Sequence, residues 1–238
     1  MASTRLPGKP LADIGGRPMI LHVLDRAREA AIGPVVVAAC DEEVAAVVRA
    51  AGGHVVMTEP ALASGSDRVH AAARSFDPDS LYDPVINLQG DLPGLPPADL
   101  RRVLAPLDDP GIDIATLVTR IGSPEEAAAS VVKVACAFAA GASTARALYF
   151  SRVAIPWGDG PLWHHIGVYA FRRAALARFV GLAPSALEQR EKLEQLRALD
   201  AGMRIGCAQV ADAPFGVDTP ADLERARALL AIPLPGAR

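Results

Sequence analysis

Two basic residues stand beside glycine and other small residues near the start of the chain. The segment ASTRLPGKP, residues 2–10, contains Arg5 and Lys9 and runs into a predicted helix. Backbone N–H groups, a guanidinium and an ammonium together suit the binding of phosphate. The segment does not match the P-loop pattern G-x-x-x-x-G-K-[ST]. It is therefore a candidate phosphate-binding loop, with a solvated basic loop as the alternative.

Two aspartates follow or precede predicted elements at positions that suit a metal ion. Asp91 follows the apolar strand at 84–88, and Asp218 stands just before the last predicted helix. Open α/β sheets bind ligands at the carboxyl ends of their strands, and Mg²⁺ prefers a few carboxylates completed by phosphate oxygens and water. The alternatives are an Asx turn before Pro93 and a capping role for Asp218.

The elements that would position these residues alternate between strand and helix. Runs rich in Val and Ile at 34–38, 84–88 and 112–118 are typical of buried parallel strands, and residues 18–31 and 42–52 predict amphipathic helices. A short strand is expected at 54–57. The pattern predicts an α/β fold in which a mixed, mostly parallel sheet lies between helices.

The composition narrows the class of protein. The chain has 238 residues, a formal net charge of −3 and dispersed charges, which gives no footprint for nucleic acid or a membrane surface. Its three cysteines are far apart and share no Cys-x-x-Cys spacing, so no disulfide framework or zinc site is indicated. We expect one domain over residues 1–238, located in the cytoplasm.

Residues 131–171 differ in character from the rest. Strand-like segments at 131–136, 147–150 and 165–171 are separated by a stretch rich in Gly and Pro at 155–161, which predicts a small β-rich lobe. Helical patterns resume at 172–180 and 187–202. A final helix is expected after Thr219 as N-cap, with Pro220 first and Asp222 third.

The opening of the chain departs from the usual order of such a sheet. An α/β nucleotide-binding sheet normally begins with a strand that leads into the first loop, whereas this chain begins with the loop sequence MASTRLPGKP. We therefore expect the first strand to be missing, either because the start is placed too late or because another segment fills its place.

Seven strings together resemble one enzyme family along essentially the whole chain. The strings ASTRLPGKPL, SGSDRV, NLQGDLP, ALYFSRVAIPW, HHIGVYAF, LEQREKLEQLR and GVDTPADLERAR occur in the order and approximate spacing of the bacterial CMP-Kdo synthetases, the 3-deoxy-manno-octulosonate (Kdo) cytidylyltransferases. The resemblance implies a Rossmann-like nucleotidyltransferase fold. Its substrates would be CTP and Kdo, its products CMP-Kdo and pyrophosphate, and its pathway lipopolysaccharide synthesis.

The resemblance also implies residues for the nucleotide. Arg5 and Lys9 would grip the triphosphate, and Asp91 and Asp218 would hold Mg²⁺. Six further residues would line the cytidine pocket, namely Ser64, Gly65, Ser66, Asp67, Arg68 and Gln89. Short hydrogen-bonding groups of this kind can discriminate between bases. For Asp67 and Arg68 the alternative is an ordinary helix start with a neighbouring surface base.

A second set is implied for the sugar acid. It consists of Arg152, His165, Tyr169, Glu194 and Gln195. The guanidinium fork of an arginine matches the two oxygens of a carboxylate, and Glu and Gln side chains can bind hydroxyl groups. The alternatives are a core role for Tyr169, a hydrogen-bonded strand histidine for His165 and a solvated helix face for Glu194.

Three other functions stay open. The acceptor sugar can be sialic acid or amino-Kdo, and without its first strand the chain can be an inactive CTP-binding homologue. The resemblance further implies a homodimer formed through the β-rich lobe.

Overall fold

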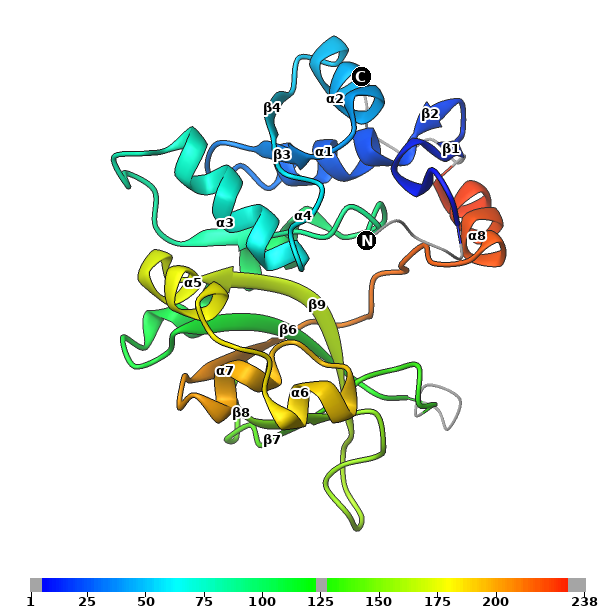
Figure 1. The fold of residues 1–238 in the computed structure, drawn as a ribbon. Coiled ribbons are helices and arrows are strands. Elements are labelled where there is room, and N and C mark those ends of the chain that lie inside the picture. The colour runs from blue at the N-terminus through cyan, green and yellow to red at the C-terminus, as the bar shows by residue number, and fades with distance from the viewer. Residues whose placement is uncertain (1–5, 123–127, 231–238) are drawn as a thin grey trace. The chain divides into compact units, whose positions relative to one another are not determined.

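The computed structural model describes residues 6–122 and 128–230, and these residues divide into two compact units (Figure 1). The first unit comprises residues up to 78, residues 88–100 and residues from 214 onward. The second comprises residues 79–87 and 101–213. Among the described residues, every helix is too short or too polar to span a bilayer.

The first unit is mainly helical around two short parallel strands. Its elements are η1 Lys9–Leu11, β1 Asp13–Ile14, β2 Arg17–Pro18, α1 Met19–Glu29, β3 Val36–Ala39, α2 Glu42–Ala50, β4 His54–Met57, α3 Gly65–Phe76 and α8 Pro220–Leu230, while α4 Pro97–Arg102 lies where the chain passes between units. Strands β3 and β4 pair in parallel, as the alternation of strand and helix predicts.

Helix α1 forms because its apolar residues recur on one face. Ile20, Leu21 and Leu24 are buried and cluster with Val48 of α2. Burying a side chain of this size contributes about 1.5–3 kcal/mol, so this cluster is a main source of stability for the first unit. The predicted helices at 18–31 and 42–52 are confirmed, as is the strand at 54–57.

The second unit is built on a six-stranded sheet. Its elements are β5 Val85–Asn87, η2 Ala105–Asp108, β6 Ile114–Arg120, β7 Lys133–Cys136, β8 Thr144–Ser151, β9 Trp163–Phe171, α5 Arg173–Val180, α6 Ala186–Glu191, α7 Leu196–Asp200 and β10 Ile205–Gln209. The strand order is β5-β9-β6-β10-β8-β7. The first six residues of β6 are buried, as expected for a central strand covered on both faces.

The expectation of a mostly parallel sheet was wrong for this unit. Only β6 and β10 pair in parallel, and the other pairs are antiparallel. Strands β5 and β6 do run in the same direction, because each is antiparallel to β9, but β9 lies between them. The alternation of elements thus predicted the common direction of β5 and β6, but neither the strand order nor the antiparallel strands beside them.

The sheet closes on itself. In addition to pairing with β8, β7 pairs with β9 through Lys133 and His164. Strands β9, β6, β10, β8 and β7 therefore form a closed ring. The strands expected in a β-rich lobe at 131–171 are β7, β8 and β9, and they share this larger sheet with β5, β6 and β10.

One predicted helix is two separate helices in the structure. Residues 187–202 were expected to form a single helix, but α6 ends at Glu191 and α7 begins at Leu196. Lys192 between them has a left-handed backbone, with φ 59° and ψ 43°, which stops an α-helix. The next residue, Leu193, is buried, so packing of this side chain outweighs the local helical preference.

Candidate active site

A lysine joins the two predicted metal-binding aspartates in the first unit. Lys9 Nζ donates to Asp91 Oδ2 at 2.7 Å and to Asp218 Oδ1 at 2.8 Å. The Lys9 side chain is 12% exposed, whereas those of Asp91 and Asp218 are 29% and 53% exposed. Three residues that are distant in the sequence thus form one charged cluster that solvent and ligands can reach.

The two aspartate segments are locked together by their backbones. The N–H of Val217 donates to the carbonyl of Asp91 at 3.0 Å. Gly94 lies against the ring of Phe215, and a Cβ at Gly94 would come within 2.2 Å of that ring. Only glycine fits this approach without movement of the ring, and it fixes the loop after β5 against the segment before α8.

Lys9 reaches the carboxylates from a tight turn. Gly8 has φ 66° and ψ 17°, a left-handed conformation that glycine adopts at little cost. The turn leads into η1, and the next residues pack into a cluster formed by Ile14, Met19 and Val217. The predicted basic loop is therefore held by the same core that contains Val217, the neighbour of Asp218.

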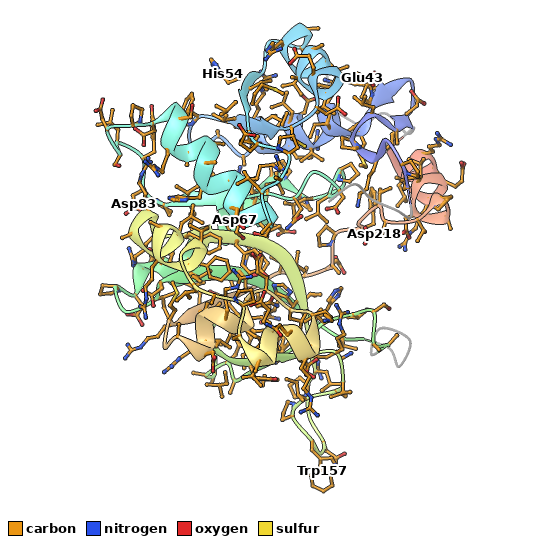
Figure 2. The ribbon with its side chains drawn as sticks, viewed as in Figure 1. Glu43, His54, Asp67, Asp83, Trp157 and Asp218 are labelled. Atoms are coloured by element: carbon orange, nitrogen blue, oxygen red, sulfur yellow. The ribbon has the colours of Figure 1, made fainter. Side chains whose placement is uncertain are left out.

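Residues other than Asp218 cap the start of α8. The N–H of Asp222 donates to Thr219 Oγ1, and Asp222 Oδ2 accepts from the N–H groups of Thr219 and Asp218. The predicted roles of Thr219, Pro220 and Asp222 at this helix are confirmed. Asp218, labelled in Figure 2, stands just ahead of the helix and accepts from Lys9.

The cluster keeps Lys9 charged. Burial lowers the pKa of the Lys9 ammonium, but the hydrogen bonds and charges of Asp218 and Asp91 outweigh this effect, so the pKa lies above its ordinary value of 10.5. Among the described residues, no group of three or more His, Cys, Asp or Glu side chains gathers at a metal-binding distance. Asp91 and Asp218 nevertheless supply carboxylate oxygens, the kind of donor that Mg²⁺ takes together with phosphate oxygens and water.

The predicted cytidine-binding residues cluster at the start of α3. Ser64 caps this helix: its Oγ accepts from the N–H of Asp67 at 3.2 Å and donates to Asp67 Oδ2 at 2.8 Å. Arg68 donates to Thr58 Oγ1 just after β4. Gly65 is the first residue of α3, and Ser66 is buried. The helix-start role considered for Asp67 is thus present in the structure.

Gln89 lies elsewhere in the first unit, on the loop after β5, and is exposed. Arg5 lies outside the described residues.

A bulge in β9 organises the second predicted set. Thr116 of β6 pairs with Tyr169, but Leu117 pairs with Ile166, so β9 has two extra residues at this point. Thr116 Oγ1 lies 2.8 Å from the carbonyl oxygen of Val168 and 3.1 Å from that of Ile166. Bulges of this kind often redirect side chains beside active sites.

The bulge brings His165 and Tyr169 together. Their ring centroids are 5.4 Å apart, and His165 Nε2 lies 3.1 Å from Thr116 Oγ1. Burial, with a smaller contribution from His164, lowers the pKa of His165 to about 3. Burial and the neighbouring Glu194 raise the pKa of Tyr169. At neutral pH both side chains are therefore uncharged hydrogen-bonding groups.

The remaining predicted sugar-acid residues lie at the ends of elements in the same unit. Arg152 directly follows β8, and Glu194 and Gln195 directly precede α7. Gln195 is 6% exposed, and its Nε2 atom has no hydrogen-bond partner within the described structure. A buried amide N–H costs free energy when it is not hydrogen-bonded, so this atom is a candidate for contact with a ligand.

Three residues that contact the predicted sugar-acid residues were not identified from the sequence: Thr116, beside His165, and Lys133 and Glu191, which contact the backbone of Arg152. Thr116 lies inside an apolar strand, so the sequence gives no signal of its role. Lys133 did give one, because a lysine inside the apolar run VVKVAC must find partners when buried. Glu191 looked like one of several charged residues on a helix.

The chain belongs to the cytidylyltransferase family, whose model matches residues 1–205. Within it the chain is 62% identical to the 3-deoxy-manno-octulosonate cytidylyltransferase of Rhodospirillum centenum, over 100% of this chain and 93% of that protein. The protein of the same name from Paramagnetospirillum magneticum is 58% identical, with 97% and 94% covered.

Solved structures agree with this assignment. A CMP:2-keto-3-deoxy-manno-octonic acid synthetase complexed with CTP superposes with a TM-score of 0.87 at 42% identity, covering 96% of this chain and 94% of that one. A putative glucose-1-phosphate thymidylyltransferase from Bacillus anthracis, at 17% identity and a TM-score of 0.66, shares the fold alone. The predicted α/β nucleotidyltransferase fold is confirmed.

Proposed function

We propose that this protein transfers CMP from CTP to the anomeric hydroxyl of Kdo and releases pyrophosphate, as a step in lipopolysaccharide synthesis. The observation that carries this proposal is the cluster in which Lys9 bridges Asp91 and Asp218. High identity to proteins named 3-deoxy-manno-octulosonate cytidylyltransferase supports the choice of both substrates. Cys40, Cys136 and Cys207 are free cysteines, which suits a reducing compartment, so we place the protein in the cytoplasm.

The reaction forms one bond and breaks one. The anomeric oxygen of Kdo bonds to the α-phosphorus of CTP, the bond from that phosphorus to the bridging oxygen breaks, and the hydroxyl proton passes to solvent. Such transfers depend mainly on positioning and on neutralising charge.

Residues of the first unit bind the nucleotide in this proposal. The Lys9 ammonium donates to triphosphate oxygens, and Arg5 assists it. Asp91 and Asp218 would hold Mg²⁺, which when bound supplies positive charge to the phosphate oxygens. The residues from Ser64 to Arg68, together with Gln89, line the cytidine pocket.

Residues of the second unit bind the sugar acid. The guanidinium of Arg152 pairs with the Kdo carboxylate through its two-pronged geometry. Neutral His165 and Tyr169, together with Glu194 and Gln195, bind hydroxyl groups. The buried Gln195 Nε2 atom supports this role, because a bound hydroxyl oxygen would satisfy it.

The test is release of pyrophosphate by the purified chain in the presence of Mg²⁺, CTP and Kdo. We expect release with Kdo and much less with sialic acid or amino-Kdo. Release with sialic acid alone would assign a different acceptor. Tight CTP binding without release would instead indicate an inactive homologue.

We also propose a homodimer formed through residues 131–171. Trp157 lies at the tip of the connection between β8 and β9 and is fully exposed (Figure 2). Leu148 and Val153 are 64% and 66% exposed, so apolar surface is available for a second copy. Size-exclusion chromatography with light scattering should give the mass of a dimer, and Trp157→Ser should weaken it.

A further inference from the structure

The carboxylate of Glu191 holds the end of β8 on both sides of one peptide bond. Glu191 Oε1 accepts from the Ser151 hydroxyl at 2.8 Å, and Oε2 accepts from the N–H of Arg152 at 3.0 Å. Hydrogen bonds to an ionised group are stronger than neutral ones. The backbone from which the Arg152 side chain projects is therefore fixed by a residue 39 positions away in the sequence.

The Arg152 side chain contacts the carbonyl groups at the end of α6. Its Nε donates to the carbonyl of Glu191 at 2.8 Å, and Nη2 lies 3.4 Å from the carbonyl of Lys192. The last carbonyls of a helix have no partners within that helix, and they attract cations. Lys192, whose left-handed backbone ends α6, thus provides one of the carbonyl groups beside the guanidinium.

Capacity for a ligand remains on this guanidinium. A third contact joins Nη1 to the carbonyl of Ala129 at 3.4 Å. Arginine has five N–H donors, and the three contacts described leave one on each Nη nitrogen. Two such donors match the two oxygens of a carboxylate, and Arg152 is partly exposed.

The side chain of Lys133 also contacts Arg152. Its side chain is fully buried, and Nζ donates to the carbonyls of Ala128, Val131 and Arg152 at 2.9, 2.7 and 2.5 Å. Three acceptors match the three N–H groups of an ammonium. Burial and the charge of Arg152 lower the pKa of Lys133, while Glu191 raises it.

We propose that Glu191 is a positioning residue that orients Arg152 for the carboxylate of the sugar acid. This inference rests on the proposed function, because it concerns the residue assigned there to the acceptor. Glu191 does not touch the substrate in this proposal. It acts by holding the Arg152 backbone with its carboxylate and the guanidinium with its carbonyl.

The main test is Glu191→Gln, which keeps the shape of the side chain but cannot accept from both Ser151 and Arg152. We expect the KM for Kdo to rise about tenfold, or about 1.4 kcal/mol, with the KM for CTP unchanged. A role as mere counter-charge predicts the opposite sign, because loss of an anion would tighten Kdo binding. An unchanged or lower KM for Kdo in Glu191→Gln would therefore overturn the inference.

Arg152→Gln separates this inference from the proposed function. Here we expect the KM for Kdo to rise at least as much, and the double variant Glu191→Gln with Arg152→Gln to be no worse than Arg152→Gln. If Arg152→Gln leaves this KM unchanged, the assigned role of Arg152 and the inference both fail. If it raises the KM and Glu191→Gln does not, only the inference fails.

One further measurement does not depend on activity, and one further variant tests another partner of the Glu191 carboxylate. The backbone N–H of Arg152, which donates to the Glu191 carboxylate, should exchange slowly with solvent when it is followed by NMR and much faster in Glu191→Gln. Equal exchange would contradict the inference even if no turnover occurs. Ser151→Ala, which removes one partner of the carboxylate, should raise the KM for Kdo by about twofold to threefold. Glu224→Gln, on an exposed ion pair with Arg227, is the matched control.

Discussion

His165 and Tyr169 face each other at 5.4 Å between ring centroids, although they are four positions apart on one strand. In a regular strand, side chains at that spacing are about 13 Å apart. The bulge at Gly167 and Val168 removes this separation, and the Thr116 hydroxyl occupies the inside of the bulge. The spacing of two predicted sugar-acid residues thus depends on a buried residue of a different strand.

Thr116→Val should disturb this arrangement without changing side-chain volume much. The substitution leaves the bulge carbonyls and His165 Nε2 without the hydroxyl, so we expect the free energy of unfolding to fall by about 1–3 kcal/mol. The KM for Kdo should also rise. Urea denaturation and steady-state kinetics measure the two effects. Thr116→Ser retains the hydroxyl and should stay near wild type; equal loss in both variants would show that the methyl group matters instead.

Asp91→Asn and Asp218→Asn should each slow pyrophosphate release by about a hundredfold, the size of effect seen when one preorganised charge is lost. Each should also raise the Mg²⁺ concentration needed for half of the maximal rate, because an amide is a poorer ligand than a carboxylate. Asp25→Asn is the control, since Asp25 pairs with Arg17 away from this cluster. Full rate of Asp91→Asn at saturating Mg²⁺ would refute the metal-binding role.

Gly94→Ala should lower both stability and activity. The added Cβ would lie 2.2 Å from the Phe215 ring, and overpacking of this kind costs about 1–3 kcal/mol. Movement of the ring would shift the segment that carries Asp218. Combining Gly94→Ala with Phe215→Leu should recover part of the rate. Gly33→Ala, where no atom lies within 4 Å of the new Cβ, is the control for thermal unfolding.

His165 should make the protein less stable in mild acid. Its pKa is lowered from 6.5 to about 3 by burial, so the unfolded chain takes up a proton at a higher pH than the folded chain does. As the pH falls below about 6.5, this site alone reduces the free energy of unfolding by about 1.4 kcal/mol per pH unit. Above that pH its contribution is constant.

Denaturant unfolding at pH 7.5, 6 and 5 of wild type and His165→Asn tests this. The variant should lose stability at every pH but show a shallower decline toward acid. His54→Asn changes an exposed histidine and should keep the slope of wild type. Parallel slopes in all three proteins would mean that His165 takes up its proton at the same pH in the folded and the unfolded chain, which would contradict the lowered pKa.

Features set by adjacent residues were predictable from the sequence. The start of α8 follows from Thr219, Pro220 and Asp222, whose capping geometry involves only one turn of chain. The positions of Asp91 and Asp218 and the family resemblance both placed these residues at one Mg²⁺ site; the structure brings both carboxylates to Lys9, and their binding of Mg²⁺ stays a prediction.

Features set by distant contacts were not predictable. The position of β9 between β5 and β6 depends on which strands pair, and no local pattern encodes this choice. The break between α6 and α7 at Lys192 likewise has no glycine or proline in the sequence to indicate it. It depends on tertiary contacts, namely the burial of Leu193 and the contact of the Arg152 guanidinium with the Lys192 carbonyl. For the same reason Glu191 looked like an ordinary surface residue.

The closure of the sheet at Lys133 also bears on how the protein avoids self-association. A strand at the end of a sheet exposes unpaired N–H and C=O groups, which can recruit strands from other molecules into aggregates. By the strand order β7 would be such an edge, but part of its outer side is paired with β9. Among the described strands of this sheet, β5, with three residues, is the other terminal strand, and so short an edge offers little to a growing aggregate.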